Sequence, residues 1–278
     1  MTDLQTKTID EANIYDATPY ESYPYHKTSI DKIYTIGKIF GLDSPKLDNA
    51  RVLELGCMSG ANIIPHAIHY PKAKFVGIDL SGTGVDIANA HIKELGLKNI
   101  EIKSASVTDI DNSYGEFDYI ICHGVISWVP EKIRHKIFDL CNQLLSKNGM
   151  AYISYNTLPG WNMVRSIREM MLYHAKNFNG VGDKIQQGQL LLNFITENSQ
   201  SKDNPYVEIL SEEAKLLAAQ PVNYLLRDHL GANNHQYYFH EFMAEAAKNG
   251  LQYLGDLDLA TMYLGNMPEK IVEKLKEV

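Results

Sequence analysis

The sequence lacks any long hydrophobic run. A helix that crosses a bilayer needs about 20 consecutive apolar residues, so we expect no membrane insertion. The first stretch, MTDLQTKTIDEANIYD, has no apolar core, and we therefore expect no signal peptide. Lys and Arg are in the minority, at 26 against 34 Asp and Glu, which gives a formal charge of −8. This acidity argues against a nucleic-acid partner bound by bulk phosphate neutralisation. It does not exclude a local basic groove that binds RNA.

Cysteine is also scarce. Cys57, Cys122 and Cys141 are the three cysteines, and none of them forms a C-x-x-C pair. A small, odd number of cysteines fits a reducing cytosol and supports neither a disulfide framework nor a zinc site. We therefore expect a cytoplasmic protein without a bound metal. The 278 residues, 45% of them hydrophobic and 22% charged, are enough for one large domain or one domain with a smaller appendage.

Residues 1–45 form the first of three predicted parts. They contain a run of tyrosines punctuated by proline, Tyr20 to His26, which is typical of a loop or an extended chain. Apolar residues recur at near-helical spacing from about 29 to 40 and predict an amphipathic helix there. We expect this part to act as a lid over a site on the next domain. The alternative is that the tyrosines only staple the first helix onto the sheet.

Residues 46–161 alternate short apolar runs with helical stretches. The predicted strands span 52–55, 75–78, 100–103, 117–122 and 150–155, and the predicted helices span 61–70, 83–95 and 131–146. This alternation predicts a parallel sheet with right-handed crossovers, hence a doubly wound, Rossmann-like α/β domain. Ligands of such sheets bind beyond the carboxyl ends of the strands, so the residues that follow each strand are the candidates for a site.

From residue 162 to residue 278 we predict an appended helical module. The strand signal disappears after about residue 163, and apolar residues recur with helical periodicity. The predicted helices of this module span 163–175, 185–196, 206–219, 236–248 and 269–278.

A glycine-containing turn follows the first predicted strand. Glycine allows the backbone to turn sharply and to pass close to a ligand. A dinucleotide loop has the pattern G-x-G-x-x-G, but Met58 and Ala61 replace two of those glycines here. Glu54, two residues before Gly56, and Gly60, four residues after it, fit the spacing of an S-adenosylmethionine (SAM) loop better. The alternative is a tight turn with no ligand.

Polar residues follow the next two strands. Asp79 lies 23 residues after Gly56, where a carboxylate can accept two hydrogen bonds from a ribose diol. The alternative is that Asp79 is the N-cap of the next helix. Ser106, with Asp109 as a second candidate, would accept a hydrogen bond from the adenine amino group. The alternative is an ordinary loop serine.

His123 and Gly124 follow the fourth strand. At that place they would face the methionine part of the cofactor or the site of transfer. His123 could move a proton, although a lone histidine is more often structural.

Residues 51–161 resemble a class I SAM-dependent methyltransferase. The runs 119–130 and 154–161 resemble one subgroup more narrowly, which carries a C-terminal methyltransferase regulatory domain. That subgroup includes the rickettsial protein-lysine methyltransferases that modify outer-membrane proteins. Further similarity lies in 20–25, 56–62, 163–174, 238–242 and 250–256. Larger members continue into another C-terminal region that this chain lacks, so we expect a short member or a truncated one.

The resemblance implies SAM as the cofactor. Including the loop residues above, the expected cofactor contacts are Tyr20, Tyr25, Glu54, Gly56, Cys57, Gly60, Asn62, Asp79, Leu80, Ser106, Val107, His123 and Gly124. It also implies a protein substrate, with a surface or outer-membrane protein before its export as one candidate. The oligomeric state is left open.

The implied reaction is in-line methyl transfer to a deprotonated lysine amine. Such a reaction depends mainly on positioning and on exclusion of water. We expect Tyr155 or Asn156 to orient the amine through an oxygen acceptor, Trp161 to form a wall of the channel, and His123 to be the next candidate. The alternative is that Trp161 pins the helical module to the sheet while the other two cap backbone groups. A small-molecule methyltransferase and a non-catalytic SAM-binding scaffold are the competing functions.

Overall fold

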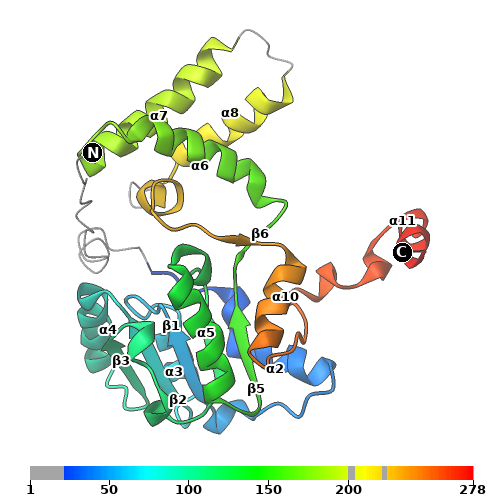
Figure 1. Cartoon of the computed structure of the whole chain (residues 1–278). Coiled ribbons are helices and arrows are strands. Elements are labelled where there is room, and N and C mark those ends of the chain that lie inside the picture. Colours follow the sequence, from blue (N-terminus) through cyan, green and yellow to red (C-terminus); the bar gives the residue numbers. More distant parts are fainter. Residues whose placement is uncertain (1–21, 200–203, 221–223, 278) are drawn as a thin grey trace. The chain divides into compact units, whose positions relative to one another are not determined.

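Figure 1 presents a computed structural model of the chain, which describes residues 22–199, 204–220 and 224–277. Tyr20, one of the expected cofactor contacts, lies outside the described residues.

The chain folds as two units. The first, which we call the sheet unit, consists of residues 22–123, 135–153 and 243–277. The second, which we call the helical unit, consists of residues 124–134 and the described residues of 154–242. The division into 1–45, 46–161 and 162–278 concerns roles in function, and it stays a prediction.

The sheet unit is built on five parallel strands in the order β3-β2-β1-β4-β5. The strands are β1 (Arg51–Leu55), β2 (Lys74–Asp79), β3 (Ile100–Ser104), β4 (Phe117–Cys122) and β5 (Leu145–Ile153). The helices between them are α3 (Ile63–His69), α4 (Gly82–Glu94) and α5 (Glu131–Leu144). The strand order reverses between β1 and β4, which is where a doubly wound sheet binds its ligand. The predicted Rossmann-like fold is confirmed.

The central strands β1 and β4 are buried almost throughout. Val52, Leu53 and Ile120 are fully buried, as expected where both faces of a parallel sheet are covered. Helix α2 (Ile30–Ile39) packs against β5, and the predicted amphipathic helix at 29–40 is confirmed. Its Gly37 allows this close approach, because a Cβ atom there would lie 2.8 Å from the sulfur of Met150.

The last strand differs from the prediction. β5 begins at Leu145, and α5 ends at Leu144, whereas the sequence pattern predicts a helix to 146 and a strand from 150. The pairing register shifts from Phe117–Leu145 to Tyr119–Met150, so the start of β5 bulges. Asn148 adopts a positive φ of 62° in this bulge. Such an irregular start has no period of two, which is why the alternation of the sequence does not reveal it.

The helical unit packs three long helices around an apolar core. These are α6 (Trp161–Ala175), α7 (Val181–Asn198) and α8 (Pro205–Ala218), which lie close to the predicted positions. Their core consists of Ile167, Met171, Ile185, Leu192, Leu210, Leu217 and Leu225. Leu225–His229 forms one π-helical turn.

A short parallel ladder in the same unit corrects the prediction that strands end near residue 163. β6 (Asn156–Thr157) pairs with β7 (Gln236–Tyr237). The helix predicted at 236–248 therefore begins only at Phe239, as α10 (Phe239–Lys248). A strand of two residues is too short for the sequence pattern to reveal it.

The remaining elements are short. The last helix is α11 (Glu269–Lys276). Turns of 3-10 helix lie at His26–Thr28, Leu47–Asn49, Val107–Asp109, Asn112–Tyr114, Ile126–Trp128, Leu259–Thr261 and Leu264–Asn266. None of the helices in the described ranges has the length and apolar character needed to span a membrane.

The packing of Gly77 in β2 gives a first prediction. A Cβ atom at Gly77 would lie 2.8 Å from the Sγ atom of Cys57 and 3.0 Å from Ile102. We expect Gly77→Ala to lower the free energy of unfolding by about 1–3 kcal/mol, because overpacking a core strains it. Adding Cys57→Ala removes the clashing sulfur and should restore most of the loss. The measurement is urea-dependent hydrogen exchange of the β1 and β2 amides.

The matched control is Gly182→Ala in α7, because no atom lies within 4 Å of a Cβ built there. This control should leave the exchange of the β2 amides unchanged. If Gly77→Ala is as stable as the control, the close packing of Cys57 against β2 is not a constraint on the fold.

Candidate active site

The loop between β1 and α3 turns through three residues with positive φ. Gly56 has a φ of 76°, Met58 of 50° and Gly60 of 75°. The backbone N–H groups of Gly56 and Cys57 both donate to the carbonyl of Ile78, at 2.8 and 3.2 Å. The loop is therefore held against the end of β2. The side chain of Cys57 is buried against β2, which leaves its backbone as the part that can meet a ligand.

Met58 occupies the place where a glycine is usual in such loops. A positive φ in a non-glycine residue costs about 1–2 kcal/mol, so other contacts must hold it. The side chain is 8% exposed. Its sulfur would lie 3.1 Å from a Cβ atom on Gly84, in the first turn of α4. The methionine thus keeps the turn of the backbone and packs its side chain against a helix of the same unit.

The carboxylate of Asp79 joins the two loops that follow β1 and β2. Its Oδ2 atom accepts a hydrogen bond from the backbone N–H of Met58 at 2.7 Å. Its Oδ1 atom accepts one from the N–H of Ser81 at 2.8 Å. Ser81 itself is the N-cap of α4, because its Oγ atom accepts from the N–H of Gly84 at 3.0 Å. The cap of this helix is therefore a neighbour of Asp79, and the carboxylate has a different structural role.

A buried hydrogen-bond chain links β1 to the segment before α2. The Nδ2 atom of Asn62 donates to Oε1 of Glu54 at 2.6 Å. The Oδ1 atom of Asn62 accepts from the N–H of Tyr25 at 2.9 Å and from the hydroxyl of Thr28 at 3.0 Å. Ser22 adds a contact, because its Oγ atom accepts from the N–H of Ala61 at 3.3 Å. The described part of the predicted lid, residues 22–28, is thus tied to the β1–α3 loop.

Glu54 has an unusual electrostatic environment. Its pKa is raised to about 7, because burial and, to a smaller extent, the charge of Asp79 raise it by more than the hydrogen bond from Asn62 lowers it. Its Oε2 atom is buried and has no hydrogen-bond partner among the described residues. One carboxylate oxygen at the end of β1 is therefore available to a donor or a cation that the described chain does not supply.

His123 lies at the end of β4 between two tyrosine rings. The ring centroids of His123 and Tyr25 are 4.3 Å apart in an edge-on arrangement, and Tyr152 is tilted at 5.9 Å. The hydroxyl of Tyr152 lies 3.5 Å from Nδ1 of His123. Burial lowers the pKa of His123, so the ring is neutral at pH 7 and one of its nitrogens can accept a proton.

Ser106 follows β3 and caps a short turn. Its Oγ atom accepts from the N–H of Thr108 at 3.2 Å and from the Thr108 hydroxyl at 2.8 Å. Its own N–H donates to Oδ2 of Asp109 at 3.0 Å, which completes a capping box that begins the turn at Val107. Both lone pairs of the hydroxyl are used in this way. The hydroxyl is thus better placed to donate a hydrogen bond than to accept one.

Tyr155 belongs to an aromatic cluster in the helical unit. Its ring stacks on Phe242 with centroids 4.0 Å apart and an angle of 11° between the planes. Tyr237 of β7 meets the same ring edge-on at 5.9 Å. Tyr155 lies just beyond β5, in contrast to the predicted strand at 150–155.

Asn156 and Gly124 are positioned by serine hydroxyls in the same unit. The N–H of Asn156 donates to Oγ of Ser127 at 2.9 Å, and the N–H of Gly124 donates to Oγ of Ser154 at 2.9 Å. The Nδ2 atom of Asn156 is buried without a partner among the described residues.

Trp161 begins α6 and meets Trp128 edge-on, with ring centroids 5.7 Å apart. Both indoles belong to the helical unit.

The predicted residues thus fall into two groups. The sheet unit contains Tyr25, Glu54, Gly56, Cys57, Gly60, Asn62, Asp79, Leu80, Ser106, Val107 and His123, and the helical unit contains Gly124, Tyr155, Asn156 and Trp161.

Sequence reasoning missed several partners of these residues. Thr28 belongs to no motif, and Ser127 lies in the run 119–130 that carries the family resemblance, but nothing in the sequence indicates their hydrogen bonds to Asn62 and Asn156 in distant parts of the chain. Phe242 lies in one of the runs that carry the family resemblance, and that run was the available signal. No group of three or more potential metal ligands occurs within residues 22–199, 204–220 and 224–277.

Comparisons with known proteins agree with this fold. The family model described as "Methyltransferase domain" matches residues 52–149, and the model described as "Predicted methyltransferase regulatory domain" matches residues 221–278.

Relatives are found in rickettsiae. RP789 and RP028, both uncharacterised proteins of Rickettsia prowazekii, are 56% identical over 273 residues and 45% identical over 240 residues. These matches cover 98% and 86% of this chain, but 49% of RP789 and 96% of RP028. The solved structure of PKMT2 from Rickettsia typhi in complex with AdoHcy matches with a TM-score of 0.82 and 45% identity, over 93% of this chain and 50% of that one. The chain thus spans about half the length of two of these relatives. It belongs to the methyltransferase family in which a Rossmann-like methyltransferase domain is followed by a methyltransferase regulatory domain.

Proposed function

We propose that this chain is a protein-lysine N-methyltransferase that uses SAM. The observation that carries the proposal is the construction of the β1–α3 loop at the switch point of the sheet, where Asp79 holds the backbone of Met58 and Asn62 holds the side chain of Glu54. Family membership supports methyl transfer with SAM as the cofactor. Protein lysine as the acceptor is supported by the resemblance to the rickettsial enzymes and by the match to PKMT2.

The residues present fit SAM. Asp79 would hold the ribose diol, because a carboxylate at the end of β2 can accept hydrogen bonds from both hydroxyls. The unpartnered Oε2 atom of Glu54 would receive the cationic amino group of the methionine part. Leu80 and Val107 would border the adenine, and Ser106 would donate its hydroxyl proton to a ring nitrogen.

The segment 22–28 would close over this site. Three hydrogen bonds tie it to Asn62 and Ala61, and the ring of Tyr25 packs on His123. A covered site excludes water, which strengthens the electrostatic contacts inside it.

SAM supplies an electrophilic methyl group on a sulfonium. The chain must then present a neutral amine, although a free lysine has a pKa near 10.4. Desolvation between aromatic rings lowers the pKa of an amine, and a tyrosine supplies both an apolar wall and a hydroxyl acceptor. Tyr155 and Asn156 would orient the amine, Trp161 would form a wall, and the neutral ring of His123 is the next candidate to accept its proton.

The test of this function is transfer of a labelled methyl group from SAM to proteins, lysine peptides and small amines. Label recovered as methylated lysine after acid hydrolysis supports the proposal. Label found only in small amines indicates a small-molecule methyltransferase. Cofactor binding without transfer to any acceptor indicates a non-catalytic SAM-binding protein.

The second prediction separates ribose binding from helix capping. We expect Asp79→Ala to weaken the affinity for S-adenosylhomocysteine by about 1.5–3 kcal/mol, the range for loss of a charged acceptor. Ser81→Ala is the matched control, because it removes the cap of α4 and leaves the carboxylate in place. It should cost about 1 kcal/mol of stability and leave the affinity unchanged. Calorimetry and thermal melting of both variants provide the comparison, and equal affinity in both would remove Asp79 from the site.

The third prediction concerns the pH dependence of stability through Glu54. Because its folded-state pKa of about 7 lies above that of the unfolded chain, ionised Glu54 destabilises the fold. This penalty is absent at low pH, where both states are protonated. It grows as the pH rises from about 4.5 to 7 and is complete above that range. Glu54→Gln keeps an acceptor for Asn62 and removes the penalty.

We therefore expect the stability advantage of the variant over the natural sequence to grow by about 2 kcal/mol as the pH rises from 5 to 8. Urea unfolding at a series of pH values measures this gain. Glu116→Gln, at an exposed position, is the matched control and should show no such gain. A constant difference between Glu54→Gln and the natural sequence across this range contradicts the prediction.

The fourth prediction tests Tyr155. Tyr155→Phe keeps the ring that stacks on Phe242 and removes only the hydroxyl. Under the proposed role, kcat should fall by at least about tenfold, which corresponds to about 1.4 kcal/mol of transition-state stabilisation. Cofactor affinity and melting temperature should barely change. A lower melting temperature with kcat intact would show that Tyr155 is structural and would direct attention to His123.

A further inference from the structure

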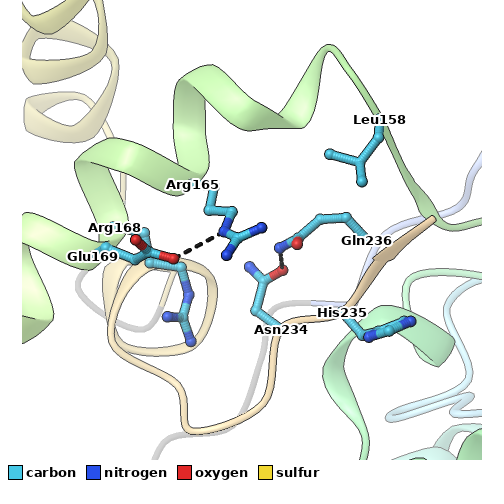
Figure 2. Close-up of a pocket in the computed structure, with 7 residues that line it drawn as sticks. All are labelled: Leu158, Arg165, Arg168, Glu169, Asn234, His235 and Gln236. Atoms are coloured by element: carbon cyan, nitrogen blue, oxygen red, sulfur yellow. Dashed lines mark hydrogen bonds and ion pairs between the residues drawn. The ribbon is translucent and has the colours of Figure 1, made fainter. Parts of the chain in front are cut away.

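A polar cavity of about 300 Å³ lies in the helical unit (Figure 2). Helix α6 contributes Arg165, Arg168 and Glu169, and the segment at β7 contributes Asn234 and Gln236. None of these residues belongs to the site described above. Figure 2 shows the Arg165 guanidinium beside the paired amides of Asn234 and Gln236.

Arg168 is a buried cation with an unused donor. It is 6% exposed, and one of its terminal nitrogens donates to the carbonyl of Gly231. Its Nε atom is buried and has no partner within the described part of the chain. Burial lowers its pKa, while the charges of Glu169 and Asp228 raise it. Because the pKa of a guanidinium group ordinarily lies far above neutral, the group stays charged at neutral pH, and a buried donor on a charged group is costly to leave unpaired.

Asn234 presents a second unused donor to the same cavity. Its Oδ1 atom accepts a hydrogen bond from the side-chain amide of Gln236, which fixes the direction of the Asn234 amide. Its Nδ2 atom is thereby left as a donor, and it is buried without a partner among the described residues. The pairing of β7 with β6 holds Gln236 in place, so this donor is positioned by the fold.

The third donor, which is charged, lies at the solvent side of the cavity. Arg165 is paired through its Nε atom with Oε1 of Glu169 at 2.8 Å, and both side chains are more than half exposed. The carboxylate in the lining is thus engaged by Arg165, and it does not satisfy the buried Nε atom of Arg168.

These groups select the charge of a ligand. The lining itself holds two guanidinium groups and one carboxylate, an excess of one positive charge, and Asp228, outside the lining, offsets part of the charge of Arg168. A phosphate monoester carries about −1.5 to −2 charges at pH 7, more than this excess of positive charge balances. A carboxylate carries one charge, and its two oxygens can accept separate bonds from a guanidinium and an amide.

We propose that this cavity is a binding site for a carboxylate group that belongs to an acidic side chain or to the C-terminus of a peptide. The inference deepens the proposed function, because on a protein methyltransferase such a site would help to select the substrate. Binding itself does not require SAM or methyl transfer.

The test uses the full chain without cofactor. N-acetylglutamate methylamide is the probe, and the ¹H–¹⁵N signal of the Arg168 Nε–H group is followed by NMR. We expect a saturable shift. The neutral glutamine analogue and inorganic phosphate should give none at the same concentration. Peptides with and without an amidated C-terminus, each with and without glutamate, distinguish a side-chain carboxylate from a terminal one.

Three variants test the site, and they should change its affinity for the probe in opposite directions. Asn234→Asp places a carboxylate inside the cavity and still offers an acceptor to Gln236, so it should abolish probe binding without lowering the melting temperature. Arg165→Gln should weaken binding, and Glu169→Gln should strengthen it, each by about two- to fivefold, as expected for exposed charges. Lys176→Gln is the matched control, because it removes a positive charge just beyond the end of α6, outside the cavity lining.

The proposal is overturned if the glutamine analogue binds as well as the glutamate probe. It is also overturned if Glu169→Gln and Arg165→Gln change affinity in the same direction, or if Asn234→Asp still binds the probe. Because these measurements need no methyl donor, their failure leaves the methyltransferase assay untouched. Failure of that assay, in turn, leaves the carboxylate site standing.

Discussion

The carboxylate of Asp79 is the group on which the β1–α3 turn depends. A turn with three positive φ angles, one of them at Met58, does not persist without contacts that hold it. The hydrogen bond from the Met58 N–H to Asp79 at 2.7 Å supplies one such contact, and the packing of the Met58 side chain toward α4 supplies another. A methionine can therefore stand where a glycine is usual, since the strain is offset within the same unit. The departure from the usual glycine pattern is a change in how the turn is held, not a loss of the turn.

The fold could be predicted from the sequence where structure follows a local period. The strands of a parallel sheet covered on both faces read as short apolar runs, and those before 145 agree with the structure to within one residue at each end. The spacing of apolar residues does not reveal the bulge near Asn148 or the two-residue strand β7, because neither contains a repeating pattern of apolar and polar residues. Residue type also fails to assign the N-cap of α4. Asp79 and Ser81 are both good capping residues two positions apart, and only the geometry gives the cap to Ser81.

The candidate site shows the same limit. Glu54 and Asp79 were predictable because they lie at the ends of strands that meet at one edge of the sheet, and Asn62 was predictable from the family resemblance. Their partners were not. The bond between Thr28 and Asn62 spans 34 positions, and Tyr152 and His123 lie 29 positions apart. A contact of this kind depends on the final packing, so the spacing of residues in the sequence does not predict it.

Among the buried side chains that are incompletely paired within the described residues, Glu54 and Arg168 differ in the sign of the charge they can carry. Glu54 in the sheet unit has an unpartnered oxygen, and Arg168 in the helical unit has an unpartnered nitrogen. An unsatisfied buried polar atom costs about 1–3 kcal/mol, and an apolar residue of similar size would avoid that cost. Stability therefore explains neither residue, whereas a ligand of opposite charge explains both. The acidic group fits the cationic end of SAM, and the basic group fits a carboxylate. The same reasoning from unpaired buried atoms thus leads to the cofactor in one unit and to a site for an acidic ligand in the other.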